Sequence, residues 1–79
     1  MIFNDFCNTI FNLLEREPIA VSKSTNLRDD LDVDSLQMVN LATSLADYYE
    51  IPFSLFIERA EMMSTVGGLY EIVKEGVSK

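Results

Sequence analysis

The sequence contains no histidine and only one cysteine, Cys7. Without histidine, the chain cannot form the Ser–His or Cys–His pair that activates many enzymatic nucleophiles, and it lacks the commonest transition-metal ligand. A single cysteine cannot form an intramolecular disulfide, and it leaves a zinc site without enough ligands. We therefore expect no metal site, no catalytic activity, a cytoplasmic location and an ordinary core position for Cys7.

Glycine, proline and long apolar runs are also scarce. Three Gly and two Pro in 79 residues favour helices over a turn-rich β fold. No apolar run approaches the length of a membrane-spanning helix, and the first five residues lack the basic segment of a signal peptide. A chain of this length has room for one small core, so residues 1–79 are interpreted as a single domain and a monomer without membrane insertion.

Basic residues are outnumbered, with six Lys and Arg against 13 Asp and Glu. The net charge of −7 and the pI near 4.2 argue against nucleic acids or anionic membranes as partners, because their phosphates would be repelled. The charge favours partners with basic surfaces, although acidity can also serve solubility alone.

Apolar residues recur at helical spacing along most of the chain. Residues 2–15, 35–49 and 66–75 are predicted to form three main helices, and residues 53–61 a short one. Pro18 should stop the first helix and Gly76 should end the last. Residues 17–33 form a connection long enough to suggest a function. The expected fold is an all-α four-helix bundle with a long loop between its first two helices.

The second helix is predicted to be the central element because its apolar side is wide. That side comprises Met38, Val39, Leu41, Ala42, Leu45, Ala46, Tyr48 and Tyr49. The polar side is a narrow stripe of Gln37, Asn40, Thr43, Ser44 and Asp47. A mostly apolar helix in so small a protein should contact several neighbours at once.

An acidic run, Asp-Asp-Leu-Asp-Val-Asp-Ser-Leu at 29–36, directly precedes this helix. Asp34 is predicted as its N-cap, with Gln37 three residues later in a capping-box arrangement. Ser35 would then be the first helical residue, with its hydroxyl exposed at the positive end of the helix dipole. An exposed serine in this position is a candidate for covalent modification.

The acidic run allows two other interpretations. Asp30, Asp32 and Asp34 match positions 1, 3 and 5 of a calcium-binding EF-hand loop. That loop requires Gly where Ser35 stands and a bidentate Glu where Leu41 stands, so two decisive positions fail. The simplest alternative is that Asp34 only caps the helix while the other acids are solvated, and the tripeptide Asp-Ser-Leu alone does not exclude it.

The segment from Leu27 to Leu36 resembles the phosphopantetheine attachment motif of acyl carrier proteins. In that motif an apolar residue and two variable ones precede Asp-Leu, usually Gly, any residue and then Asp-Ser-Leu. Downstream, Ile51-Pro52 resembles the Ile-Pro after the family's second helix, and Thr65-Val66-Gly67 resembles the Thr-Val-Gly that opens its last helix. The resemblance covers nearly the whole chain.

This resemblance implies a bundle of acyl-carrier type in which a phosphopantetheinyl transferase attaches 4′-phosphopantetheine to Ser35 through a phosphodiester. The thiol of that arm would hold acyl groups as thioesters for enzymes of fatty-acid, lipid or polyketide-type synthesis. Other implied partners are an acyl-ACP synthetase or acyltransferase and ketosynthase-type enzymes with basic docking patches. An aminoacyl or peptidyl carrier and a non-carrier helical adaptor remain alternatives.

The chain departs from the family pattern in its charges. Asp32 stands where Gly is usual, and Asp47 is the one carboxylate retained on the docking face of the second helix. The acidity has moved to the preceding loop and to residues such as Glu58, which favours a specialised carrier over the housekeeping fatty-acid carrier. The residues expected to dock partners are Asp30, Asp32, Asp34, Leu36, Gln37, Asn40, Asp47 and Glu58.

Apolar residues near the second and third helices could shelter an acyl chain. The candidates for such a pocket are Val39, Phe53, Phe56, Ile57, Met62 and Leu69, and methionine suits an adaptable pocket. An ordinary core explains these residues equally well, because a small protein needs them to fold.

Overall fold

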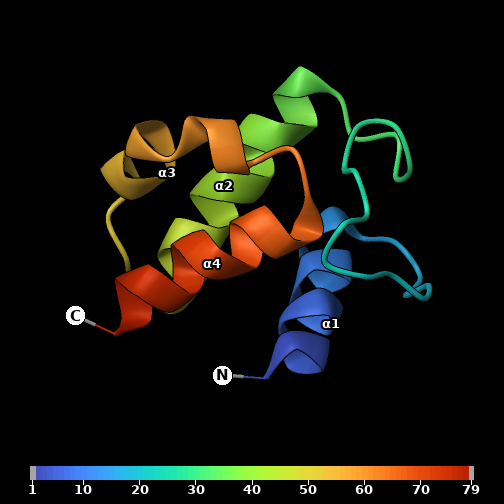
Figure 1. Cartoon of the computed structure of the whole chain (residues 1–79), viewed down its shortest axis with the longest axis horizontal. Coiled ribbons are helices and arrows are strands. Elements are labelled where there is room, and N and C mark those ends of the chain that lie inside the picture. Colours follow the sequence, from blue (N-terminus) through green and yellow to red (C-terminus); the bar gives the residue numbers. More distant parts are fainter. Residues whose placement is uncertain (1, 79) are drawn as a thin grey trace.

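The computed structural model describes residues 2–78, so the ends of the expected 1–79 domain lie outside the described residues. The expected all-α bundle, with three main helices and one short helix, is confirmed in this range (Figure 1). The expected short helix is divided into α3 and a 3₁₀ helix, η1. In chain order the elements are α1 (Phe3–Leu14), α2 (Ser35–Tyr49), α3 (Ser54–Glu58), η1 (Ala60–Met62) and α4 (Val66–Val77).

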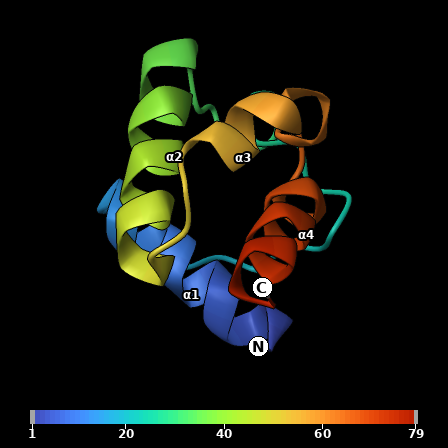
Figure 2. The same cartoon turned by 90° about the vertical axis from the view of Figure 1, so that its left-hand side faces the viewer.

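Helix α4, and not α2, has the most neighbours in the bundle. It packs against α1, α2, α3 and η1, whereas α2 packs mainly against α1 and α4. Figure 2 shows α2 and α4 on opposite sides of the molecule, with α3 spanning the space between them at one end and α1 lying at the other. One long side of α2 therefore faces outward, and the prediction that α2 is the central element is wrong.

This outward side explains two further corrections. Val39 and Tyr48 were predicted on the apolar side of α2, but both side chains are more than half exposed. Each lies one helical turn from a buried residue, Ala42 and Leu45 respectively, so neither is on the side opposite the core. The buried side of α2 is formed by Leu41, Ala42, Leu45 and Ala46, and Val39 and Tyr48 lie at its two edges, where neighbouring helices do not cover them.

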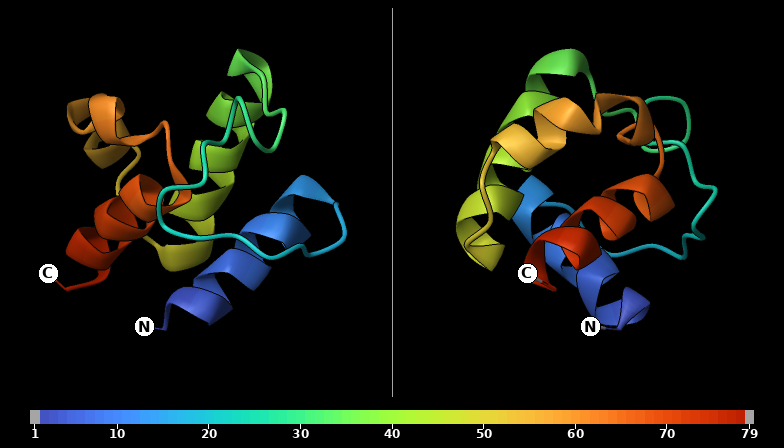
Figure 3. Two further views of the ribbon diagram at one scale, coloured as in Figure 1. Left: turned by 45° about the vertical axis from the view of Figure 1, so that its right-hand side comes forward. Right: turned by 60° about the vertical axis from the view of Figure 1, so that its left-hand side comes forward.

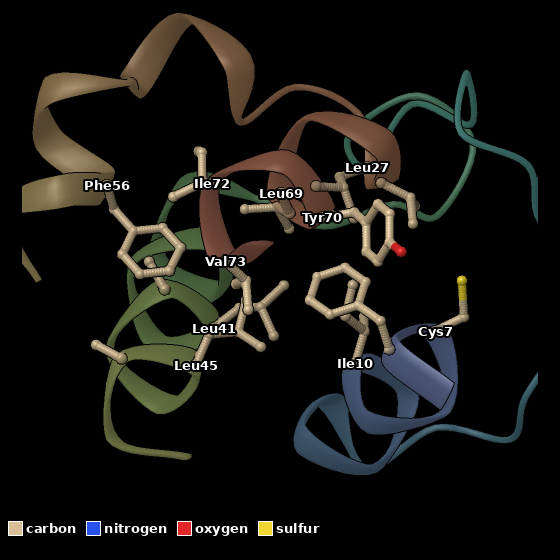
Figure 4. Close-up of a cluster of buried hydrophobic side chains, with 14 of the residues drawn as sticks. Cys7, Ile10, Leu27, Leu41, Leu45, Phe56, Leu69, Tyr70, Ile72 and Val73 are labelled. Carbon is tan, nitrogen blue, oxygen red and sulfur yellow. The ribbon is translucent and has the colours of Figure 1, made fainter. Parts of the chain in front are cut away.

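The core is assembled from the four α-helices and the long loop. Figure 4 shows side chains of α1, α2, α3 and α4 pointing into one shared interior. Cys7 is buried there as predicted, and burial raises the pKa of its thiol. No charged side chain is buried among the described residues. Large side chains with almost no exposed surface are Phe6, Ile10, Leu27, Leu45, Phe56, Leu69, Ile72 and Val73.

Helices α1 and α2 both end at a glutamate in the left-handed conformation. Glu15 and Glu50 have φ values of 56° and 54°, and their N–H groups donate to carbonyl oxygens of the preceding turn. These hydrogen bonds satisfy carbonyl groups that the helix itself leaves unpaired. Helix α1 therefore ends at Leu14, one residue before the expected boundary and ahead of Pro18.

The end of α4 differs from the prediction. The helix continues through Gly76 to Val77, so Gly76 is not its terminator. A Cβ atom at position 76 would lie 2.7 Å from Cγ2 of Ile51, which is shorter than a normal contact. The glycine therefore serves close packing between α4 and the connection after α2.

The long loop at 17–33 is tied to the start of α4. The N–H groups of Leu27, Val66 and Gly67 donate across this contact to the carbonyls of Ser64, Thr25 and Lys23, over 2.9 to 3.0 Å. Leu27, Leu31 and Val33 are buried beneath the loop. Figure 3 shows the loop passing from the end of α1, beside the first turn of α4, to the start of α2. The loop thus fixes where α2 begins.

Candidate functional site

The start of α2 is held by a reciprocal pair of hydrogen bonds. The carboxylate of Asp34 accepts from the N–H of Gln37 at 2.8 Å, and Oε1 of Gln37 accepts from the N–H of Asp34 at 3.2 Å. The predicted N-cap and capping box are therefore confirmed. They make Ser35 the first residue of the helix, with an exposed side chain.

The Ser35 hydroxyl has a cationic neighbour. Nη2 of Arg28 lies 2.9 Å from Oγ of Ser35 and donates a hydrogen bond to it. The backbone of Arg28 is itself fixed, because its N–H donates to Oδ1 of Asn26 at 2.9 Å. Sequence reasoning missed Arg28, since it occupies a variable position of the motif and only folding brings it against the serine.

Asn26 organises the turn before the serine. Its Oδ1 accepts from the N–H groups of Arg28 and Asp29, and its own N–H donates to the carboxylate of Asp30 at 2.8 Å. Such contacts stabilise the turn in the way that Asx motifs generally do. Asp30, expected as a docking residue, therefore also has a local structural role that the charge pattern did not indicate.

Arg16 connects the end of α1 to this site. Its guanidinium donates to the carbonyl of Leu31 and, at 3.3 Å, to Oε1 of Gln37. Gln37 thus takes part in the capping box and in a bond to α1, and its side chain is only partly exposed. A residue held in this way is less available to a partner than the sequence suggested.

Asp32 adopts a conformation that explains why its position usually holds glycine. Its φ is 57°, in the left-handed region that side chains disfavour. Aspartate tolerates this region better than most residues, because its short polar side chain can interact locally. Asp32 can therefore occupy a position whose backbone conformation favours glycine.

The remaining candidate docking residues lie on the surface. Leu36, Asn40 and Asp47 are exposed, and their spacing of four and seven places them along one side of α2. Leu36 is 70% exposed, which is unusual for a leucine beside a polar site. Glu58 is exposed at the end of α3, and its neighbour Arg59 pairs with Glu75 of α4.

An apolar cavity of about 220 Å³ lies between α2 and α3. Four of the expected pocket residues, Val39, Phe53, Phe56 and Ile57, line it. Two others lie elsewhere: Leu69 is fully buried in the core and Met62 is not part of the lining. Three further apolar residues complete the lining: Met63, which the sequence also suggested for such a cleft, and Ala42 and Ala60, which it did not.

A second cavity of about 320 Å³ lies beside Arg28. Its other lining residues are Asn26 and Asp29 of the long loop, Met38 of α2, and Ala60, Met63 and Ser64 between α3 and α4. Ala60 and Met63 also line the apolar cavity. The two cavities are therefore neighbours, with Ala60 and Met63 between them. An exposed hydroxyl, a nearby cation and a neighbouring apolar cavity fit a phosphorylated arm that carries an apolar group.

Carboxylates of the acidic run do not gather into a cation site. Among residues 2–78, no three His, Cys, Asp or Glu side chains lie close enough together to hold a metal ion. The carboxylates of Asp30 and Asp34 accept hydrogen bonds from backbone N–H groups instead. The described helices also include none with the length and apolar character needed to cross a membrane.

Comparison with known proteins identifies the family. The family model described as "Phosphopantetheine attachment site" matches residues 5–73. Acyl carrier proteins of Lactobacillus acidophilus and Lactobacillus johnsonii are 32% and 33% identical over 75 residues, covering 92% of this chain and 89% of each relative. The acyl carrier protein of a Picosynechococcus species is 32% identical over 74 residues, or 94% of this chain and 89% of its own.

No solved structure matches the chain at comparable significance. The fold, the match to the family model and the full-length relatives agree with one another. Members of the family are loaded by a phosphopantetheinyl transferase and serve synthetic enzymes. The chain belongs to the acyl carrier proteins, which carry acyl groups on a covalently attached 4′-phosphopantetheine and have no catalytic activity of their own.

Proposed function

We propose that Ser35 carries the 4′-phosphopantetheine arm. The observation that supports this is the position of its hydroxyl: exposed on the first residue of α2, between the capping box and the guanidinium of Arg28. In this position the hydroxyl is accessible to a transferase, and the helix dipole favours the negative charge that attachment adds. Attachment would leave the buried core untouched.

The attachment reaction requires a donor that holds the arm through a pyrophosphate bond. Oγ of Ser35 forms a new bond to phosphorus, while the pyrophosphate bond breaks and the nucleotide leaves with the electron pair. The hydroxyl proton passes to a base of the transferase as the bond to phosphorus forms. Once attached, the arm supplies a terminal thiol that holds an acyl group as a thioester.

Mass spectrometry tests this assignment directly. Co-expression with a broad-range phosphopantetheinyl transferase should increase the mass of the protein by one phosphopantetheine group, and Ser35→Ala should abolish the increase. Ser54→Ala is the matched control, because Ser54 is also an exposed serine at the first position of a helix. A mass increase that survives Ser35→Ala would contradict the assignment.

The exposed side of α2 and the acidic loop form the proposed docking surface. Leu36, Asn40 and Asp47 supply an accessible edge next to the arm, while Asp32 and Glu58 add exposed negative charge. Asp30, Asp34 and Gln37 belong to the same surface, although each also stabilises the loop or the helix start. A basic patch on an acyltransferase, acyl-ACP synthetase or ketosynthase would complement this charge.

The apolar cavity between α2 and α3 is proposed to shelter the acyl chain. Its lining is entirely apolar, and Ile57 and Val39 at its mouth are more than half exposed. Nuclear magnetic resonance of the loaded protein provides the test. A long acyl chain should shift the signals of these residues and a short one should not. Equal spectra for both would show that the cavity is only a packing defect.

A dedicated lipid or polyketide-like pathway in the cytoplasm is the proposed setting of this single carrier domain. The support is the loss of carboxylates from α2, where Asp47 is the remaining one. Housekeeping fatty-acid ketosynthases should therefore use the loaded protein poorly, and Asp47→Ala should reduce that use further. Efficient turnover of the unmodified carrier by these enzymes would contradict the proposal.

A further inference from the structure

We propose that Arg28 is a positioning residue that binds the phosphodiester of the attached arm. The inference rests on the proposed attachment at Ser35. Before attachment, the guanidinium donates a hydrogen bond to the Ser35 hydroxyl at 2.9 Å. After attachment, a phosphorus atom is bonded to that same oxygen, so its non-bridging oxygens are placed next to a donor that is already present.

The other cations of the described range are engaged elsewhere. Arg59 pairs with Glu75 at 3.1 Å and Lys74 with Glu71 at 3.8 Å. Arg16 donates to the loop and to α2, as described above, and the ammonium of Lys23 lies over the rings of Phe3 and Tyr70. Arg28 differs from all of these, because its side chain contacts the proposed attachment point.

A neutral hydroxyl uses little of what a guanidinium offers. Within residues 2–78, Arg28 forms no ion pair with a carboxylate, although four aspartates precede the serine. A phosphate oxygen is a stronger acceptor, since charge-assisted hydrogen bonds are about twice as strong as neutral ones. The planar guanidinium can also donate two parallel hydrogen bonds to a phosphate group.

The position of Arg28 gives this contact two consequences. Attachment adds one negative charge where the loop is already acidic, and the guanidinium offsets the resulting repulsion. Arg28 also lines the 320 Å³ cavity, which shares Ala60 and Met63 with the apolar cavity. A phosphodiester held by Arg28 would therefore start the arm at the mouth of this cavity.

A thermodynamic cycle tests the proposal. The melting temperature is measured before and after complete loading, as confirmed by mass, for the unmodified protein, Arg28→Gln, Arg28→Lys and the control Lys74→Gln. Loading should lower the melting temperature of Arg28→Gln by about 2–6 °C more than that of the unmodified protein. Arg28→Lys should recover part of this difference, and Lys74→Gln should behave like the unmodified protein.

Two further measurements distinguish a contact to the phosphodiester from a purely structural role of Arg28: the ³¹P signal and the dependence of the melting temperature on salt. The ³¹P signal of the phosphodiester should shift in Arg28→Gln but not in Lys74→Gln, and the difference in melting temperature should shrink at high salt. If Arg28→Gln resists loading, Arg28→Lys completes the cycle. Equal loading effects and equal ³¹P signals in all proteins would overturn the role of Arg28 alone, whereas an unmodified Ser35 would overturn both proposals.

Discussion

The long loop at 17–33 and the α3–η1 segment at 54–62 differ in a way that their secondary structure conceals. The loop has no helix or strand, yet it buries Leu27, Leu31 and Val33 and is tied to the start of α4 by backbone hydrogen bonds. The α3–η1 segment is helical and buries Leu55 and Phe56, yet α3 has no side-chain cap and η1 buries no residue. The irregular region is therefore fixed through its backbone, whereas the helical one is held by buried side chains and by the Arg59–Glu75 ion pair.

The difference matches the proposed roles of the two regions. The loop sets the position of Ser35 and Arg28, and a modification site has to be presented in one conformation to a transferase. The α3–η1 segment lines the apolar cavity together with α2, and a cavity for acyl chains has to adjust to its contents. Among the described residues, the backbone of 54–62 is hydrogen-bonded only to nearby residues of the chain, whereas that of 25–33 is also bonded to the start of α4, so we expect hydrogen exchange to be faster at 54–62 than at 25–33.

The largest expected effect comes from truncating one leucine or isoleucine in each region. Leu27→Ala should reduce the free energy of unfolding by about 2–5 kcal/mol, because Leu27 is fully buried. Ile57→Ala should change it by no more than about 0.5 kcal/mol, because Ile57 is 64% exposed. Chemical denaturation of both variants measures the difference. Similar losses would contradict the difference in burial between Leu27 and Ile57.

Replacing either of two adjacent glycines of α4 should have an intermediate effect on the free energy of unfolding. Gly67 faces the loop and Gly68 faces η1. A Cβ atom at Gly67 would lie 2.6 Å from the carbonyl oxygen of Lys23 in the loop, and one at Gly68 would lie 1.6 Å from that of Met62 in η1. Overpacking of this kind costs about 1–3 kcal/mol. Gly67→Ala should therefore destabilise the whole protein, whereas Gly68→Ala should be relieved mainly by movement of η1.

Hydrogen exchange distinguishes these two outcomes. Gly68→Ala should accelerate exchange within residues 57–65 and leave the loop protected. Gly67→Ala should accelerate exchange in the loop and at the start of α2. A Gly68→Ala variant in which protection is lost uniformly would show that η1 is as rigid as the loop.

Removing a side-chain organiser of the loop should have a smaller effect. Asn26→Ala deletes the acceptor for the N–H groups of Arg28 and Asp29, and should cost about 1–2 kcal/mol of the free energy of unfolding. Ser54→Ala, at the uncapped start of α3, should be nearly neutral. Thermal unfolding of both variants provides the comparison, and an equal loss at Ser54 would contradict it.

Helical spacing and cap residues predicted the main elements because these signals are local. Asp34, Gln37 and the periodic apolar residues of α1 and α4 carry their information within one or two helical turns. Contacts between distant segments could not be predicted in this way. Three such contacts depend on how the helices pack against one another and against the loop. They are the hydrogen bond from Arg28 to Ser35, the hydrogen bond from Arg16 to Gln37 and the packing of Gly76 on Ile51.

The exposed side of α2 shows the same limit. A wide apolar side predicted a central helix, but hydrophobicity alone does not distinguish residues buried in the core from residues that line a cavity or face a partner. Val39 is apolar and lines the cavity from the surface, whereas Leu41 is apolar and buried. The distinction arises from where α4 and α3 sit, which the α2 sequence does not encode.

The smallest expected effect lies at the one loop residue in a strained conformation. Asp32 has a φ of 57°, a region that costs most non-glycine residues about 1–2 kcal/mol but aspartate less. Asp32→Gly would remove that strain but make the unfolded chain more flexible, so the free energy of unfolding should rise by less than about 1 kcal/mol. Asp32→Val should lower it, because a β-branched residue fits this conformation poorly. Denaturant titration of the two variants measures both signs. If the loop is held through its backbone, the strain of Asp32→Val should reach the start of α2 and shift the nuclear magnetic resonance signals of Ser35 and Leu36. Destabilisation without a change in these signals would show that the loop deforms locally instead.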